Sequence, residues 1–333
     1  MENFITQALR GFSIKCRGAT KEKSYYVCNT DKGLKILQKA EGSPDNILFQ
    51  HKIKETLFEN GFKNIDRFAL SQSGAPYVAV DNEIYTAADR APAQKDTDFS
   101  DAVEFARITS SVAEMHYILK KASLERTNIM MYVNGGKNAD EMYNKYMSEL
   151  KYYKKIVSRK SRMSDFDVLF IKNYDFYAGA LADWHEIIKS PGYANVIAGG
   201  YAECYVCHNL LKEETVVKSN DEIYITNFSE CGVSHYINDF SSIIKRHIKN
   251  ASPAYVPLGE IIRVYSAANP LSADEIQALR ADLIFPDKFL KICSMYYSKK
   301  RSWIPAAFVE RVESVTSGRE RQLQYINEFY SGF

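Results

Sequence analysis

The first part of the chain alternates between short apolar runs and polar turns, which is the pattern of β-strands. Residues 11–16, 24–29 and 33–39 are three such runs, and residues 18–21 and 31–33 are predicted turns between them. Side chains of a strand alternate between its two faces, so the runs fit a half-buried sheet. We therefore predict that the chain begins with a small sheet.

One helix interrupts these strands. Pro44 and Asp45 open a stretch in which apolar residues recur at helical spacing, and Gly61 ends it. Its predicted inner face is formed by Ile47, Leu48, His51, Leu57 and Phe58. Two further strands and a crossing segment follow at residues 67–71, 77–80 and 83–86. The pattern predicts a five-stranded sheet with a helix inserted after its third strand.

From Ala87 onward apolar residues recur every three or four positions, which predicts helices. The first of these begins after Ser100, a capping residue, and its apolar face ends at His116. Two more are predicted from Asp140 and over residues 175–189. Later helices are predicted from Asp239, from a capping box at Ser272 and Glu275, and near the C-terminus.

Two strand-like runs lie within this helical part. Residues 202–207 and 222–225 flank the polar segment 208–221, and we predict that they form one β-hairpin. The fold class is therefore α+β and bilobal. Residues 1–86 form the predicted small β-rich lobe, and residues 87–333 form the predicted larger helical lobe.

Composition and charge narrow the class of protein. Of the 333 residues, 46% are hydrophobic and 25% are charged, which is typical of a folded globular chain. A net charge of +2 is far from that of nucleic-acid-binding proteins. We find no apolar run long enough to span a membrane and no signal-peptide pattern at the N-terminus. We expect a cytosolic, reducing compartment, in which the six cysteines are free thiols.

Several stretches resemble known families. Residues 55–62 form a helix end with a Gly-Phe pair, and residues 99–116 form a helix that ends in a histidine. Residues 285–289 are a Phe-Pro-x-Lys-Phe run, and residues 296–303 are a Tyr-Tyr and Lys/Arg-rich stretch that ends at a tryptophan. With the order of elements, they resemble the protein-kinase-like fold of aminoglycoside and choline phosphotransferases, and specifically the CotS-type spore-coat proteins of sporulating Firmicutes. The resemblance implies assembly with other spore-coat or structural proteins and leaves the oligomeric state open.

The resemblance also assigns positions for the groups that phosphoryl transfer needs. Phosphotransferases clamp the phosphates with a lysine on the third strand. Here Gln38 occupies that position and Lys39 follows it, so these two are weak candidates for cofactor binding. Strand alternation places Gln38 on one face with Leu34 and Ile36, whereas Lys35 and Lys39 belong to the other face.

The predicted catalytic loop, residues 208–217, lacks a general base. In active relatives it reads His-Gly-Asp, followed five residues later by Asn. Here His208 is kept, Leu210 matches the Asp and Thr215 matches the Asn. A shift of one residue would instead place Asn209 at the Asp position. Neither leucine nor asparagine takes up a proton near neutral pH, so both alignments leave the base position empty.

The predicted metal loop, residues 226–230, places Asn227 where relatives have the Mg²⁺-binding aspartate. A neutral amide is a poor ligand for a hard dication. One element of the fold is kept, since Asp239 matches the aspartate that braces the catalytic loop. The resemblance gives His116 a structural role as well.

We therefore predict a non-catalytic, kinase-like (pseudokinase) protein of the spore coat or a related structure, with no catalytic residues, metal or cofactor. One alternative is an atypical phosphotransferase for small molecules that uses ATP and Mg²⁺, with a site built from Lys39, Glu213 or Glu214, and Glu230. Another is a switch protein that binds nucleotide without metal.

Two other motifs compete with this interpretation. Cys204-x-x-Cys207 followed by His208 matches c-type haem attachment, a redox dithiol, or part of a metal site with Cys231 or His208. A redox pair should open a helix, whereas this pair precedes a loop next to a strand. The basic residues between 151 and 162 could contact an acidic partner or nucleic acid, but their spacing favours the solvated face of an amphipathic helix.

Overall fold

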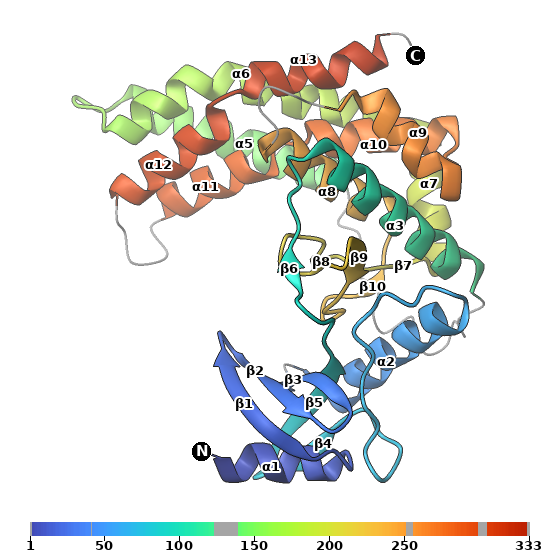
Figure 1. Ribbon diagram of the computed structural model, residues 1–333. Helices are drawn as coiled ribbons and strands as arrows, with labels where there is room; N and C mark the ends of the chain where they lie inside the picture. The colour runs from blue at the N-terminus through green and yellow to red at the C-terminus, as the bar shows by residue number, and fades with distance from the viewer. Residues whose placement is uncertain (1, 41, 123–138, 251–255, 299–304, 332–333) are drawn as a thin grey trace. The chain divides into compact units, whose positions relative to one another are not determined.

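A computed structural model describes residues 2–40, 42–122, 139–250, 256–298 and 305–331 (Figure 1). The chain divides into two compact units, which are described separately below. The first unit comprises Met1–Val133, Gly200–Tyr255 and Ile261–Pro270, and the second comprises Asn134–Gly199, Val256–Glu260 and Leu271–Phe333. The boundary between lobes at residues 86 and 87 stays a prediction.

The first unit begins with a sheet of five antiparallel strands in the order β1-β2-β3-β5-β4. Its strands are β1 (Cys16–Glu22), β2 (Tyr25–Thr30), β3 (Gly33–Lys39), β4 (Val78–Val80) and β5 (Glu83–Asp89). Helix α2 (Pro44–Glu59) follows the third strand. The predicted five-stranded sheet and the position of its helix are therefore confirmed.

The predicted start of this sheet was wrong. The first strand is not residues 11–16, and residues 18–21, which we predicted as a turn, lie within β1. The error has a physical reason: β1 is an edge strand whose middle residues are exposed on both faces, so it shows no apolar alternation. Of the three segments predicted to supply two strands and a crossing segment, residues 77–80 and 83–86 fall on β4 and β5, and residues 67–71 are the crossing segment, in which Phe68 makes an isolated bridge to Ala88.

An unpredicted helix, α1 (Glu2–Gly11), packs on one face of the sheet (Figure 1). Leu9 and Phe12 from this segment form a buried cluster with Cys28, Leu37 and Val80 of the strands. Leu37 belongs to the same face of β3 as Lys35 and Lys39, so strand alternation leaves Gln38 on the opposite face.

Helix α2 is capped by Ser43, whose side chain accepts a hydrogen bond from the amide of Asn46. Its inner face differs from the predicted one. Leu48 is 44% exposed, and His51 and Phe58 are only partly buried. Ile47 and Leu57 are buried as predicted, and the other buried residues of this helix are Phe49, Gln50, Ile53 and Lys54. Because Gln50 is polar and Lys54 is charged, the spacing of apolar residues did not identify the buried face of α2.

The rest of the first unit consists of short strands and the helices beside them. These are β6 (Lys95–Asp96), β7 (Val206–Cys207), β8 (Val216–Ser219), β9 (Glu222–Ile225) and β10 (Gly232–Val233), with helices α3 (Ala102–Lys121) and α8 (Ile237–Asn250) beside them. The predicted hairpin was wrong in its first strand: β9 pairs with β8, whereas β7 pairs with β10. Asp101 caps α3 in place of the predicted Ser100.

The second unit is helical. Its helices include α5 (Ala139–Ser158), α6 (Asp165–Ile188), most of α7 (Pro191–Ala202), α10 (Ala273–Ile284), α11 (Asp287–Ser298), α12 (Pro305–Thr316) and α13 (Arg319–Tyr330). Helix α9 (Leu258–Ala268) belongs mostly to the first unit. The helix predicted over residues 175–189 is the second half of α6. The capping box of Ser272 and Glu275 is confirmed, because each side chain bonds the other's backbone amide.

Aromatic side chains fill the core of the second unit. The Phe289 ring stacks on Tyr177, with centroids 3.9 Å apart, and Tyr296 stacks on Phe166 at 3.7 Å. Residues 299–304, which carry the end of the basic signature, lie outside the described residues. None of the helices described in the structure has the length and apolar character needed to cross a membrane.

Candidate functional site

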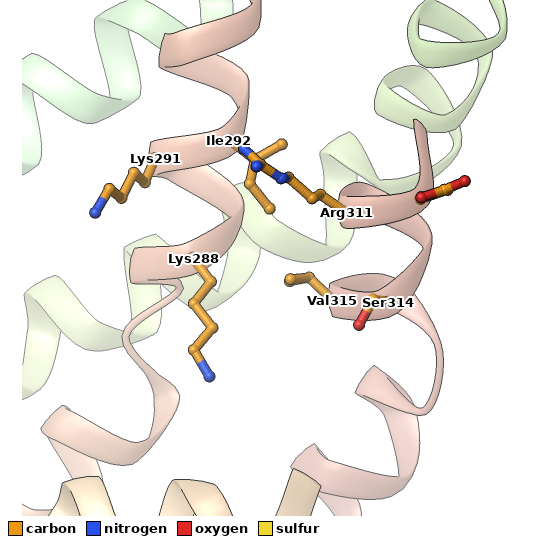
Figure 2. A pocket seen from close by; sticks show the side chains of 7 residues that line it. Lys288, Lys291, Ile292, Arg311, Ser314 and Val315 are labelled. Carbon is orange, nitrogen blue, oxygen red and sulfur yellow. The ribbon is translucent and has the colours of Figure 1, made fainter. Parts of the chain in front are cut away.

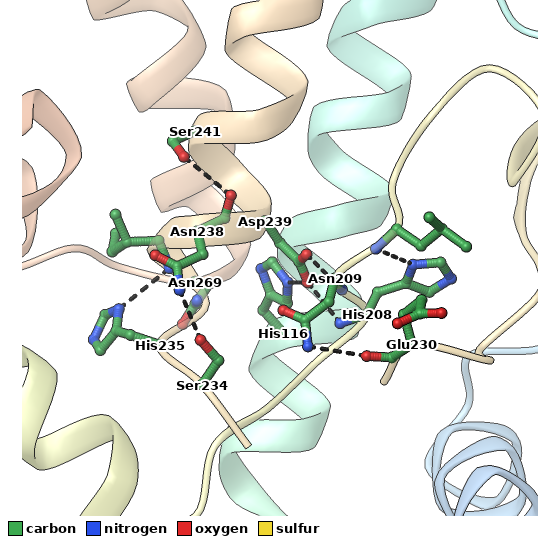
Figure 3. A network of polar contacts seen from close by, with 12 residues as sticks. His116, His208, Asn209, Glu230, Ser234, His235, Asn238, Asp239, Ser241 and Asn269 are labelled. Atoms are coloured by element: carbon green, nitrogen blue, oxygen red, sulfur yellow. Dashed lines mark hydrogen bonds and ion pairs between the residues drawn. The ribbon is translucent and has the colours of Figure 1, made fainter. Parts of the chain in front are cut away.

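The loop after β7 is held by one buried carboxylate at the start of α8 (Figure 3). Asp239 Oδ2 accepts a hydrogen bond from the His208 amide at 2.7 Å, and Asp239 Oδ1 accepts one from the Asn209 amide at 2.8 Å. Asp239 is 2% exposed, so its charge has no access to water. These two bonds fix the backbone of His208 and Asn209 relative to α8.

His116 on α3 completes the surroundings of this carboxylate. Its Nε2 lies 3.2 Å from Asp239 Oδ2, and its Nδ1 lies 2.7 Å from the hydroxyl of Tyr265. Burial raises the pKa of Asp239, but the hydrogen bonds from His116 and from the His208 amide outweigh burial and hold this pKa below its usual value. Asp239 is therefore ionised and committed to structure. The family correspondence of Asp239 and His116 stays a prediction.

His208 is fully buried and makes two bonds through its ring. Its Nδ1 accepts from the Leu210 amide at 3.2 Å, and its Nε2 lies 3.0 Å from the Thr226 carbonyl. These partners require a neutral ring with the proton on Nε2. Burial lowers the pKa of His208, in agreement with that state. His208 therefore links the loop to the end of β9 and is not placed for proton transfer.

The backbone of Asn209 bears on the alignment of the loop. Asn209 has a φ of 60°, a left-handed conformation that glycine adopts freely and that asparagine tolerates. That conformation favours matching Asn209 to the glycine of His-Gly-Asp, which leaves Leu210 at the aspartate position. The Asn209 side chain donates to the Glu230 carbonyl at 3.1 Å. This bond joins the loop after β7 to the metal loop, residues 226–230.

Thr215 also acts within the loop. Its hydroxyl donates to the Leu210 carbonyl at 2.5 Å and accepts from the Lys212 amide at 3.0 Å. Thr215 is 1% exposed. Its single hydroxyl proton is therefore used within the loop.

The metal-loop position, Asn227, also has a left-handed backbone, with a φ of 59°. Its amide donates to Asp66 Oδ2 at 3.0 Å, and its side-chain oxygen lies 3.4 Å from the Ser229 amide. The next residue, Phe228, is buried against the ring of His208, with centroids 4.6 Å apart. The side chain at this position is thus an amide rather than a carboxylate, and the neighbouring Asp66 carboxylate already accepts the Asn227 backbone amide.

Two residues missed at the sequence level support this loop from the small sheet-rich part. Lys54 on α2 lies 3.0 Å from Asp66 Oδ1 and donates to the Asp66 carbonyl at 2.8 Å. The Lys54 ammonium also lies 3.7 Å from the centroid of the Phe68 ring. Lys54 lies between Gln50 and Leu57 at helical spacing, and that spacing was the available signal for its burial.

The candidate phosphate-binding strand contains no lysine directed at this loop. Gln38 faces Tyr25 on β2 and Thr86 on β5 in the sheet register. Lys39 is 57% exposed and pairs with Glu83 at 2.8 Å, and this hydrogen bond raises the pKa of Lys39. Lys35 pairs with Asp89.

Two of the three carboxylates of the alternative site, Glu213 and Glu214, are paired with cations. Glu213 accepts from Arg246 at 2.6 Å, and Glu214 lies 3.7 Å from the Lys212 ammonium. Glu230 contributes its backbone carbonyl to Asn209. Within the described part of the chain, no group of three or more His, Cys, Asp and Glu side chains is arranged to hold a metal ion.

The cysteines near the loop are buried thiols. Cys204, Cys207 and Cys231 are all buried and free. Burial raises the pKa of Cys231 to about 12 and the pKa of Cys207 well above its usual value. Neutral thiols are poor metal ligands and poor nucleophiles. The haem, dithiol and metal interpretations of this motif therefore gain no support from its surroundings.

A family model described as "Spore coat putative kinase YutH" matches residues 6–329. The chain belongs to the YutH spore-coat family. A comparison with curated protein sequences finds no match. Membership of the YutH family agrees with the predicted spore-coat resemblance, while the narrower CotS-type assignment stays a prediction.

Solved structures show the fold of this YutH-family chain. An aminoglycoside phosphotransferase from Alicyclobacillus acidocaldarius subsp. acidocaldarius DSM 446 matches with a TM-score of 0.85 and 13% identity, over 98% of this chain and 95% of that one. An AMP-bound spectinomycin phosphotransferase matches with a TM-score of 0.63 and 12% identity, over 98% and 94%. A microcompartment-associated aminopropanol kinase matches with a TM-score of 0.59 and 13% identity, over 98% of both chains. The predicted aminoglycoside-phosphotransferase-like fold is confirmed.

Proposed function

We propose that this YutH-family protein is a non-catalytic scaffold of the spore coat that uses the phosphotransferase fold for assembly. The observation that carries the proposal is the loop held by Asp239. With Asn209 in the left-handed conformation, the residue at the base position is Leu210, which cannot accept a proton.

The metal position supports the same proposal. Mg²⁺ is bound in phosphotransferases through carboxylates and phosphate oxygens. The metal loop offers the amide of Asn227, and the nearby carboxylate of Asp66 is occupied by the Asn227 amide and by Lys54. These donors do not fit Mg²⁺ with ATP as active relatives hold it, so we derive no phosphoryl-transfer step.

Ion pairs made by residues of the alternative site also support the scaffold proposal. A site built from Lys39, Glu213 or Glu214 would first have to break the pairs with Glu83, Arg246 or Lys212. The partners of the proposed scaffold are other coat or structural proteins, and no cofactor is needed.

Isothermal titration of the full chain with ATP tests the proposal directly. Three titrations are compared: ATP with Mg²⁺, ATP with EDTA, and Mg²⁺ alone. A parallel assay follows ATP consumption in the presence of small amino alcohols and aminoglycosides. We expect no binding at millimolar nucleotide and no ATP consumption above the rate without protein.

Two results would overturn the scaffold proposal, each in favour of a named alternative. Tight ATP binding that requires Mg²⁺, together with substrate-dependent ATP consumption, would establish an atypical phosphotransferase. ATP binding of equal strength with Mg²⁺ and with EDTA, without consumption, would establish a metal-independent nucleotide switch.

A further inference from the structure

The second unit carries a shallow pocket between α11 and α12, and none of its lining residues was discussed for phosphoryl transfer. Its volume is about 330 Å³, at the lower end of the range of ligand pockets. Ile292 on α11 and Val315 on α12 point toward each other across it (Figure 2). Both pack against the buried aromatic core of this unit, so the floor of the pocket is apolar and fixed in place.

Cations surround this apolar floor. Lys288 and Lys291 come from α11 and Arg311 comes from α12, and all three are exposed. Figure 2 shows the Arg311 side chain reaching from α12 toward Ile292. One carboxylate, Glu310, also lines the pocket, so cations outnumber anions by three to one. The whole chain has nearly equal numbers of the two, 43 and 41, so this excess is local.

We propose that this cationic pocket binds an acidic segment of a partner protein that inserts one apolar side chain between Ile292 and Val315. The proposal rests on the scaffold function, for which it names the chemistry of the partner. Charge complementarity selects an acidic segment, and the apolar floor selects one that also carries a hydrophobic side chain. A nucleic acid would satisfy the cations and leave the apolar floor unused.

Fluorescence anisotropy with labelled peptides tests this inference on the full chain. The probe is a fluorescein-labelled peptide of glutamates with a single central leucine. Two control peptides carry lysines in place of the glutamates, or alanine in place of the leucine, and a labelled single-stranded DNA serves as the nucleic-acid control. We expect the glutamate and leucine peptide to bind at least about tenfold more tightly than every control.

Charge reversal in the pocket provides the matched test. Lys291→Glu and the double variant Lys291→Glu with Arg311→Glu should weaken binding of the acidic peptide by about tenfold or more, and should strengthen binding of the lysine peptide. Lys172→Glu on α6 changes the same charge at an exposed position outside the pocket and should leave both affinities within about twofold. The single variant keeps the test valid if the double variant fails to fold, which a thermal melt reports.

The inference is overturned if the acidic and lysine peptides bind equally, if DNA binds most tightly, or if Lys291→Glu and Lys172→Glu behave alike. Its outcome is independent of the nucleotide titrations. ATP consumption would contradict the scaffold function but not the peptide result. Equal binding of the peptides would contradict only the proposed role of the pocket.

Discussion

The Lys54 ammonium lies 3.0 Å from a carboxylate oxygen of Asp66, with the side chains only 1% and 8% exposed. Lys54 comes from α2, whereas Asp66 accepts the amide of Asn227 in the metal loop. This buried pair therefore joins the sheet-bearing part of the first unit to the candidate site. Phosphotransferases use a lysine and carboxylates for the chemistry of phosphoryl transfer. Here a lysine and a carboxylate are paired with each other.

Breaking this pair should destabilise the protein strongly. Lys54→Met leaves the Asp66 carboxylate buried without a cation, a change that costs about 3–5 kcal/mol in comparable cases. The double variant Lys54→Met with Asp66→Asn should cost less than the sum of the two single variants, because no charge is left unpaired. Urea unfolding measures the free energies, and equal costs for single and summed variants would contradict the coupling. Hydrogen exchange at the Asn227 amide should accelerate in Asp66→Asn.

The loop held by Asp239 gives a second prediction. Asp239→Asn keeps the shape of the side chain and removes the charge that the His208 and Asn209 amides contact. Hydrogen bonds to charged groups contribute about 1.5–3 kcal/mol each, so we expect a loss of that order or more in the free energy of unfolding. Asp221→Asn, at a side chain that is 94% exposed, is the matched control and should change little. Similar losses for both variants would contradict the bracing role.

Buried neutral histidines predict how stability depends on pH. Burial lowers the pKa of His208 and of His247 below the usual 6.5. Unfolding restores the ordinary value, so the unfolded chain binds more protons once the pH falls below about 6.5. The stability from these groups is thus complete above pH 6.5 and is lost as the pH falls from there through the folded-state pKa values. Asp239, whose folded pKa lies below its usual 3.8, loses its contribution only at still lower pH.

Urea midpoints between pH 7.5 and 5.5 test this pH dependence. Each histidine that stays neutral in the folded state contributes a slope of up to about 1.4 kcal/mol per pH unit below its unfolded pKa. His247→Gln should have a lower midpoint at pH 7.5 and a shallower slope than the wild type. An unchanged slope would show that His247 takes up its proton without unfolding.

Two neighbouring glycines at the end of α7 make a matched pair. A Cβ on Gly200 would lie 2.9 Å from a ring carbon of His235 and 3.3 Å from its Cα, so Gly200→Ala requires the backbone or the ring to move. A Cβ on Gly199 meets nothing within 4 Å. Gly199→Ala should therefore stabilise the helix, by about 0.5–1 kcal/mol, whereas Gly200→Ala should destabilise the protein. Thermal melts of the two variants test this prediction. Melting temperatures that shift in the same direction would contradict the contact with His235.

The proposed loss of charged groups at the site predicts a gain of nucleotide binding when they are restored. A variant carrying Gln38→Lys, Leu210→Asp and Asn227→Asp restores the charges that active relatives hold at these positions. We expect it to bind ATP in the presence of Mg²⁺ at least about tenfold more tightly than the wild type in isothermal titration, and to lose that gain in EDTA. A control with Asn220→Asp in a turn adds one carboxylate elsewhere and should show no gain. Equal binding by the wild type, the triple variant and the control would show that something other than the three missing charges limits nucleotide binding.

By itself, the sequence determined the class of fold and the chemical content of the candidate site. Residue type decides whether a position can carry charge or accept a proton, so Gln38, Leu210 and Asn227 could be judged without coordinates. The regular spacing of apolar residues likewise predicted the sheet, the helix after its third strand and the capping box at Ser272, because such periodicity is local.

Only the tertiary structure decided how the remaining polar groups are used. The exposed edge strand β1 and the polar inner face of α2 lack a local apolar signal, so the sequence misplaced both. The pairing of Lys54 with Asp66, and of Asp239 with two loop amides and His116, joins segments far apart in the chain. A carboxylate's role depends on the donors that folding brings to it and on its burial, and neither is written in the neighbouring residues.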